Sequence, residues 1–376
     1  MTALTPTGDA AEIDDLSDTE LRDDVVDDAE SDDEVSVERY DITSFGADYD
    51  VEGLVKRLER QDILIPAFQR DYVWNQKEAS RFVESLLLGL PVPGVFMARE
   101  ADSNKLLVID GQQRLKTLEF FFSGLFRPDP GERSHRVFKL TKVQPQFEGR
   151  TYRTLEDHDR VKLNDSIIHA TIVKQESPSG DDTSVYHIFE RLNYGGRRLT
   201  PQEIRVAIFH GDLMDALKRL NDDPTWREVF GKKSPRLKDQ ELILRYFAFS
   251  FDFGAYHRPM NEFLNKFASR NKNAPAAMLE KGSDAFRESL RILHDALGKT
   301  LFRPERTLNA AVFDSMMVGM TRRLERGGTP DVVQVREAYE KTRENERYIE
   351  TVSRSTADEK FVRERIETAT RAFAAT

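Results

Sequence analysis

The sequence of 376 residues contains no cysteine. Disulfide bonds, thiolate zinc sites and cysteine nucleophiles are therefore excluded. Seven histidines are scattered along the chain without His-x-x-His or His-Glu-x-x-His spacing, so the sequence predicts no zinc site. The chain also lacks the Gly-x-x-x-x-Gly-Lys-Ser/Thr phosphate loop and the Gly-x-Gly-x-x-Gly dinucleotide fingerprint. Two common classes of nucleotide-binding protein are thereby excluded.

Long apolar runs are absent as well. No stretch approaches the roughly 18 consecutive apolar residues that span a bilayer. The first residues lack the basic-then-apolar layout of a signal peptide. We therefore expect a cytoplasmic protein with no membrane partner. With 39% hydrophobic residues, the chain is long enough for roughly two domains with a sizeable core.

Charge is distributed unevenly. Residues 1–35 hold fourteen Asp and Glu against one Arg, and they contain no aromatic residue. The other 341 residues hold 55 Lys and Arg against 52 Asp and Glu, a net charge of +3. The composition predicts that residues 1–36 form a disordered acidic tail. A second interpretation is that the tail mimics nucleic acid and shields a basic groove until a partner displaces it.

Hydrophobic periodicity divides the remaining chain into two regions. Strand patterns alternate with helical patterns as far as about residue 212, and a capping box at Thr200–Glu203 then opens a nearly continuous series of helices. We therefore predict an α+β fold, in which an α/β lobe at residues 37–212 precedes an all-α helical lobe at residues 213–376.

A polar turn follows the apolar strand pattern of residues 106–109. It consists of Asp110, Gly111, Gln112, Gln113 and Arg114, and a helical pattern begins within it. Backbone N–H groups at a helix start attract anions, and an adjacent arginine strengthens the attraction. Asp110 could hold Mg²⁺, position a water molecule or orient an arginine. The turn is predicted to bind a phosphate, a nucleotide or a nucleic-acid backbone, although a surface turn with a capping acid is the alternative.

A second polar cluster, with two aromatic residues, also follows a short strand pattern. It contains Gln69, Arg70, Tyr72 and Trp74. Arg70 and Arg114 could each form paired hydrogen bonds with phosphate oxygens. Tyr72 and Trp74 alternate along the chain and could share one face. They are either half-buried core residues or a platform on which a base stacks.

A third cluster surrounds the glycine-rich turn at residues 193–196, after a predicted helix. Its hydrogen-bond donors are Arg191, Asn193, Arg197, Arg198 and, in the next helix, Arg205. Donors at such a turn can reach phosphate. The alternative is an ordinary helix C-cap.

The motifs resemble the domain of unknown function 262 family, which forms the N-terminal half of GmrSD-type modification-dependent restriction enzymes. The resemblance covers about residues 39–212, and four segments in the same order carry it: Phe68–Trp74, Glu84–Pro93, Val108–Leu115, and Phe189–Gly196 with Gln202–Arg205. It implies a ParB/sulfiredoxin-like fold, nucleoside triphosphate binding and hydrolysis, contact with DNA and defence against foreign DNA.

The resemblance implies roles for the first two clusters, and the donors of the third cluster add their own expected roles. Asp110, Gln112, Gln113 and Arg114 would be catalytic. Gly111, Gln69, Arg70, Arg191 and Asn193 would bind the nucleotide. Tyr72, Trp74, Arg197, Arg198 and Arg205 would contact DNA or sense its modification. Multi-domain relatives carry a histidine–asparagine nuclease domain at the C terminus, and the absence of that motif here argues against DNA cleavage by this chain.

The leading hypothesis is a nucleotide-dependent sensor or regulator of a restriction or phage-defence system, with a partner nuclease that cuts. Arg114 and Arg70 would neutralise the triphosphate, Mg²⁺ would bind at Asp110, and Asp110 or a glutamine would place the attacking water. The alternatives are a DNA-binding scaffold without turnover and a metal-dependent nuclease of modified DNA. The sequence leaves a homodimer open.

Overall fold

The computed structural model describes residues 22–27, 41–66, 72–100, 105–126, 136–177, 183–192 and 199–376. The chain divides into two compact units, which are described separately. The first unit comprises residues 33–219 and 243–283, and the second comprises residues 1–32, 220–242 and 284–376.

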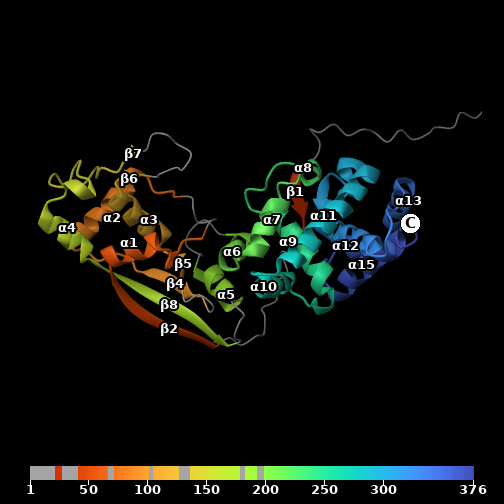
Figure 1. Cartoon of the computed structure of the whole chain (residues 1–376), viewed down its shortest axis with the longest axis horizontal. Helices are drawn as coiled ribbons and strands as arrows, with labels where there is room; N and C mark the ends of the chain where they lie inside the picture. Colours follow the sequence, from red (N-terminus) through yellow and green to blue (C-terminus); the bar gives the residue numbers. More distant parts are fainter. Residues whose placement is uncertain are drawn as a thin grey trace, which may run out of the picture. The chain divides into compact units, whose positions relative to one another are not determined.

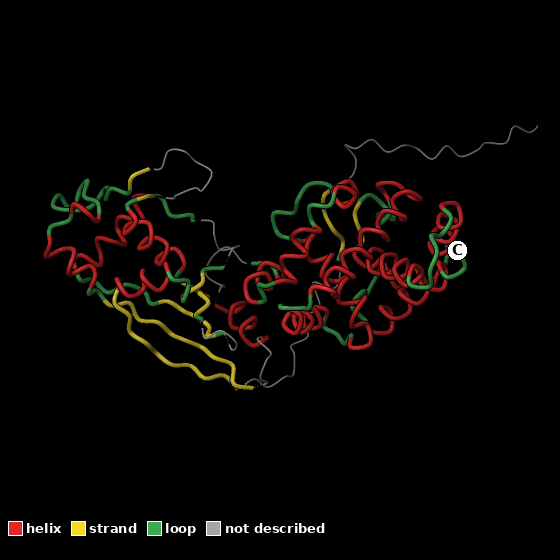
Figure 2. The backbone as a smooth tube through the Cα atoms, viewed as in Figure 1, coloured by secondary structure: helices red, strands yellow, loops and turns green. Residues whose placement is uncertain are grey.

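The first unit contains a five-stranded sheet with the strand order β2-β8-β4-β5-β3. Its strands are β2 (Asp41–Asp50), β3 (Ile63–Leu64), β4 (Val95–Arg99), β5 (Leu106–Asp110) and β8 (Ile167–Ser177). β4 runs parallel to β8 and antiparallel to β5, and β2 runs antiparallel to β8. In Figure 2, β2 and β8 form a long paired ribbon. The end of β5, the starts of β4 and β8 and the end of β2 therefore meet at one edge.

Four helices cover one face of this sheet (Figure 1). They are α1 (Val51–Glu59), α2 (Gln76–Leu88), α3 (Gln112–Ser123) and α4 (Asp157–Asn164). Asp50 caps α1 by accepting a hydrogen bond from Gly53 N, and Asn75 forms a capping box with Glu78 at the start of α2. Caps of this kind fix where each helix begins relative to the strand or loop before it.

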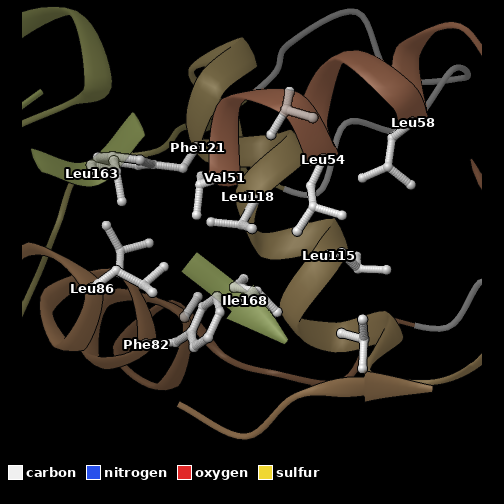
Figure 3. Close-up of a cluster of buried hydrophobic side chains, with 14 of the residues drawn as sticks. Val51, Leu54, Leu58, Phe82, Leu86, Leu115, Leu118, Phe121, Leu163 and Ile168 are labelled. Carbon is white, nitrogen blue, oxygen red and sulfur yellow. The ribbon is translucent and has the colours of Figure 1, made fainter. Parts of the chain in front are cut away.

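The core lies between these helices and the sheet. Figure 3 shows apolar side chains from α1, α2, α3, α4 and β8 packed together. Its labelled members are Val51, Leu54, Leu58, Phe82, Leu86, Leu115, Leu118, Phe121, Leu163 and Ile168, all buried. Burial of each such side chain contributes about 1.5–3 kcal/mol. The core therefore fixes α3, and with it the turn between β5 and α3.

Helix α5 (Thr183–Leu192) packs against β5 and β8. Leu107 and Ile109 alternate with the core residues Leu106 and Val108 along β5, and they are also buried. Helices α6 (Pro201–Ile208) and α10 (Met260–Asn271) pack against α5. The capping box predicted at Thr200 and Glu203 is present at the start of α6.

The other elements of the first unit are short or extend into the second unit. They are β6 (Leu125–Phe126), β7 (Arg136–Val137), the 3₁₀ helices η3 (Tyr152–Thr154) and η5 (Phe253–Ala255), α7 (Asp212–Leu220), α9 (Lys238–Asp252) and α11 (Ala276–Leu297). Helix α10 lies in the first unit, where it packs on α5 and α6.

The second unit is largely helical. Its remaining elements are β1 (Arg22–Val26), α8 (Pro224–Phe230), η6 (Gly298–Thr300), β9 (Thr307–Asn309), α12 (Ala310–Leu324), α13 (Val332–Arg343), α14 (Glu346–Ser353) and α15 (Glu359–Phe373). Trp226 is fully buried and packs its ring against Phe286 and Phe313. The predicted order, an α/β region followed by a largely helical region, is confirmed.

One segment of the acidic N-terminal region differs from the prediction. Residues 22–26 form β1, which pairs in parallel with β9 of the second unit. Asp27 follows, with a side chain only 2% exposed, and forms an ion pair with Lys238 at 2.9 Å. The prediction of a disordered tail is wrong for residues 22–27, because strand pairing with β9 and a buried ion pair with Lys238 hold them in place. The rest of residues 1–36 lies outside the described part of the chain.

Candidate functional site

The turn between β5 and α3 depends on Gly111. Its φ of +100° lies in the left-handed region, and a side chain there would place its Cβ 2.5 Å from Val95 Cγ1. Glycine alone avoids both problems. As the N-cap residue of α3, Gly111 also has no side chain with which to cap the helix. The first N–H groups of α3 therefore lack a capping partner from that position.

Arg114 lies in the first turn of α3 and is held by two acceptors. Its Nη2 donates to Gly94 O at 2.9 Å and to Asp110 Oδ2 at 3.0 Å. The Arg114 side chain is 15% exposed, whereas that of Asp110 is 56% exposed. Asp110 was predicted to hold Mg²⁺, position a water molecule or orient an arginine. Its hydrogen bond with Arg114 corresponds to the third of these roles.

Two buried polar atoms at this turn have no hydrogen-bond partner. One is the donor Nε of Arg114, and the other is the acceptor Oε1 of Gln112. Buried polar atoms in native proteins are nearly always paired, so each such atom calls for an explanation. An acceptor on a ligand would satisfy Arg114 Nε, and a donor would satisfy Gln112 Oε1.

Gln113 connects the turn to the segment that begins at Tyr72. Its Oε1 accepts hydrogen bonds from Val73 N at 3.0 Å and Trp74 N at 3.3 Å. The two motifs singled out in the sequence are thus joined by one side chain. Because its oxygen accepts these two hydrogen bonds, Gln113 stabilises the junction between the turn and the segment that begins at Tyr72. The sequence predicted a catalytic role for Gln113, and that role stays a prediction.

The aromatic residues of that segment pack inward. Tyr72 is 9% exposed and lies edge-on to the rings of Phe120 and Phe126. Its hydroxyl lies 2.7 Å from Thr117 Oγ1, which in turn donates to the carbonyl oxygen of Gln113. Tyr72 is a core residue, so the alternative of an open stacking platform is wrong for it.

Trp74 is half-buried and lies edge-to-face with Phe82, with ring centroids 5.7 Å apart. Arg205, which was expected to add to a positive surface, is fully buried. It donates to Asn265 Oδ1 at 2.8 Å and to Asn261 Oδ1 at 2.6 Å, and it thereby joins α6 to α10. Arg205 is therefore removed from the residues expected to contact DNA.

The remaining predicted site residues are placed only in part. Arg191 is exposed in the last turn of α5. Five others lie outside the described residues: Gln69, Arg70, Asn193, Arg197 and Arg198.

Two groups of titratable side chains were not among the site residues predicted from the sequence. One is a histidine–aspartate pair, and the other is a histidine with two glutamates. Across β2 and β8, Asp48 Oδ1 lies 2.8 Å from His169 Nδ1. The two residues are 121 positions apart, so no local signal could reveal the pair. On α5, the carboxylates of Glu190 and Glu262, 3.8 and 3.4 Å from the ring nitrogens, raise the pKa of His187 to about 9.

Asp110 belongs to no cluster of metal-binding side chains among the described residues. Within the ranges that the structure describes, no three His, Asp or Glu side chains are grouped closely enough to hold a metal. Mg²⁺ is usually bound by one or two carboxylates together with substrate phosphates and water. The exposed carboxylate of Asp110 fits that mode of binding, with the phosphates of a nucleotide as further ligands.

No helix in the described portions is long and apolar enough to cross a membrane. Residues 51–210 match the family model described as GmrSD restriction endonuclease, N-terminal domain. The matched range contains β5, α3 and the turn between them. No curated protein matches the chain.

Proposed function

Because residues 51–210 belong to the family of GmrSD restriction endonuclease N-terminal domains, we propose that this chain is a nucleotide-dependent sensor or regulator of a restriction or phage-defence system. It binds a nucleoside triphosphate at Asp110–Arg114, hydrolyses it and contacts DNA. A separately encoded nuclease cuts the DNA.

The observation that carries the proposal is the pair of unpartnered atoms at the turn, Arg114 Nε and Gln112 Oε1. A buried polar atom without a partner costs about 1–3 kcal/mol. Phosphate oxygens accept hydrogen bonds, and the hydroxyl or amino groups of a nucleotide donate them. A fully ionised inorganic anion offers acceptors only, so the pair favours a nucleotide.

Each residue of the turn has a role in this proposal. Arg114, held by Asp110 and Gly94, neutralises negative charge on the phosphates. The backbone N–H groups that begin α3 bind further phosphate oxygens. Asp110 keeps Arg114 in place and offers an exposed carboxylate to Mg²⁺. A bound Mg²⁺ would neutralise part of the negative charge of the phosphates.

A binding and hydrolysis assay tests the proposal. Parent protein is mixed with Mg²⁺ and each common nucleoside triphosphate, with and without DNA, and both affinity and phosphate release are measured. Arg114→Gln should lower hydrolysis about 100-fold or more, because a charged donor to the transition state is lost. Glu52→Gln is the matched control, since it breaks an exposed ion pair of the same i,i+4 spacing in the same unit.

The result that would overturn the proposal is an Arg114→Gln variant that binds and hydrolyses nucleotide like the parent, or a parent that binds none. Thermal unfolding of both variants separates loss of function from loss of fold. DNA contact is tested separately by the salt dependence of DNA affinity, which should be steep if arginines bind the backbone.

A further inference from the structure

We propose that duplex DNA binds across a basic surface formed by α2, β7 and the segment that follows β7. We call this surface the α2 basic patch, and its members are Lys77, Arg81, Arg136, Lys139 and Lys142, all of them exposed. The inference rests on the DNA contact of the proposed function and names the surface that makes it. Neither the motifs nor the family match assigns these residues a role.

The segment of residues 139–144 lies along α2. Three hydrogen bonds join them at successive turns of the helix: Gln76 Nε2 to Lys139 O at 2.6 Å, Thr141 N to Ser80 Oγ at 3.0 Å, and Gln144 N to Glu84 Oε1 at 2.6 Å. A helix rises about 1.5 Å per residue, so this contact extends over about 12 Å of α2. The cations of the helix and those of the segment are therefore held side by side.

The local structure directs these cations toward solvent. Lys77 and Arg81 directly follow two of the α2 residues that contact the segment, and their i,i+4 spacing places them on one face of the helix. Lys139 lies between Phe138 and Leu140, which are both fully buried, and it is exposed. The buried neighbours anchor the segment and leave the lysine on the surface.

The five cations of the patch have no carboxylate partner. None of them forms an ion pair with another of the described residues. Exposed cations at α1, in the same unit, differ in this respect. Lys56 pairs with Glu52 at 2.8 Å, and Arg60 pairs with Asp62 at 3.0 Å. The positive charge of the patch is thus left for a partner outside the chain.

The acids beside the patch are bonded to the backbone instead. Each of three carboxylates accepts a hydrogen bond from a main-chain amide: Glu78 from Asn75 N at 2.8 Å, Glu84 from Gln144 N at 2.6 Å, and Glu148 from Val143 N at 3.2 Å. The five cations outnumber these three acids, so the surface keeps a net positive charge.

Duplex DNA has the charge density that this surface requires. It carries one negative charge per about 1.7 Å of its axis, so its two strands present about seven phosphates over the 12 Å of the contact along α2. A small anion would engage one or two of the five cations, whereas a DNA backbone can engage all of them. Lysine and arginine contacts to phosphate release counterions, which makes the affinity depend on salt.

The test measures the affinity of the full chain for a duplex DNA oligonucleotide by fluorescence anisotropy at a series of salt concentrations. Each lost phosphate contact lowers the slope of log affinity against log salt by about 0.9. Lys139→Gln/Lys142→Gln and Lys77→Gln/Arg81→Gln should therefore each lower the magnitude of the slope by about 1.8. Because the substituted side chains are exposed, thermal unfolding of both double variants should match that of the parent.

Two controls separate contact from net charge. Lys56→Gln/Arg60→Gln removes the same charge from the same unit, but from cations that are already paired, and should lower the slope by less than about 0.5. Lys139→Arg/Lys142→Arg keeps both charges and should retain the parent slope to within about 0.5.

The inference is overturned, while the proposed DNA contact stands, if the parent binds DNA and either glutamine variant of the patch keeps the parent slope. It is also overturned if the control at Lys56 and Arg60 loses as much as the patch variants do. If the parent binds no DNA, the DNA contact of the proposed function fails and the inference fails with it.

Discussion

Replacing Gln113 by methionine tests how the two sequence motifs are joined. The change keeps the length of the side chain and removes the oxygen that accepts from Val73 N at 3.0 Å and Trp74 N at 3.3 Å. Each such hydrogen bond contributes about 0.5–1.5 kcal/mol net. Val73 is 69% exposed, so water can hydrogen-bond to its amide in the variant. Trp74 is half-buried, so its amide is less easily hydrated. We expect a loss of about 1–3 kcal/mol in the free energy of unfolding, mostly from the Trp74 N–H.

Urea unfolding and hydrogen exchange measure this effect. In Gln113→Met the amides of Val73 and Trp74 should exchange faster, while the Leu115 amide, bonded within α3, stays protected. Gln113→Glu is the control, because its carboxylate oxygen can still accept from both amides and also favours a helix N-terminus. It should remain within about 1 kcal/mol of the parent.

The reasoning would be refuted by a methionine variant that unfolds at the parent's urea concentration with unchanged exchange at Val73 and Trp74. Gln113 would then not hold this segment. The catalytic role expected from the sequence would become the better explanation for a glutamine at this position.

Three further predictions concern other positions. Gly111→Ala should lower the free energy of unfolding by about 2 kcal/mol or more, seen in urea melts, because φ there is +100° and the new Cβ meets a neighbouring side chain at 2.5 Å. The nearby carboxylates of Glu190 and Glu262 raise the pKa of His187 to about 9, so the stabilisation from the charged His187 is complete below about pH 6.5 and is lost as pH rises through 9. Unfolding at pH 6 and pH 9.5 should show this loss in the parent but not in His187→Gln. Asp27→Ala should lower the free energy of unfolding by about 1–3 kcal/mol and speed proteolysis near the N terminus, because it breaks the buried ion pair with Lys238. The loss is moderate because Lys238 keeps its ion pair with Glu241.

Local signals in the sequence predicted local structure well. Thr200 opens α6 with the predicted capping box, and local signals of the same kind operate where Asp50 caps α1 and Gly89 ends α2 in the left-handed conformation. In each case the partner lies within four residues. The antiparallel pair β4 and β5 is local as well, because its two apolar runs lie close together in the sequence.

Features that depend on distant partners could not be predicted. The helical pattern continues through residues 201–220, but α6 and α7 are separated at Gly211, where a side chain would meet Lys272 O at 2.5 Å. Arg205 reads as a surface cation until α10 supplies its asparagine partners. β1 lies in a strongly acidic segment, and only its pairing with β9 makes it a strand.

The strand, turn and helix that carry the candidate site were predicted in their positions, whereas the roles of the site residues stay predictions. The sequence located the turn at Asp110–Arg114, because a strand, a glycine and a helix start are local features. It could not separate Arg114, which presents a buried unpartnered donor, from Gln113, whose oxygen binds two backbone amides 39 and 40 residues away. That distinction exists only after the chain has folded.

The central claim is that a nucleotide binds at the start of α3, and hydrogen exchange of the full chain tests it most directly. The first N–H groups of a helix have no partner within the helix and exchange quickly. With Mg²⁺ and a nucleoside triphosphate, peptides covering residues 108–116 should become protected in the parent and remain unprotected in Arg114→Gln. Unchanged exchange across these residues at a nucleotide concentration that saturates binding would contradict the account.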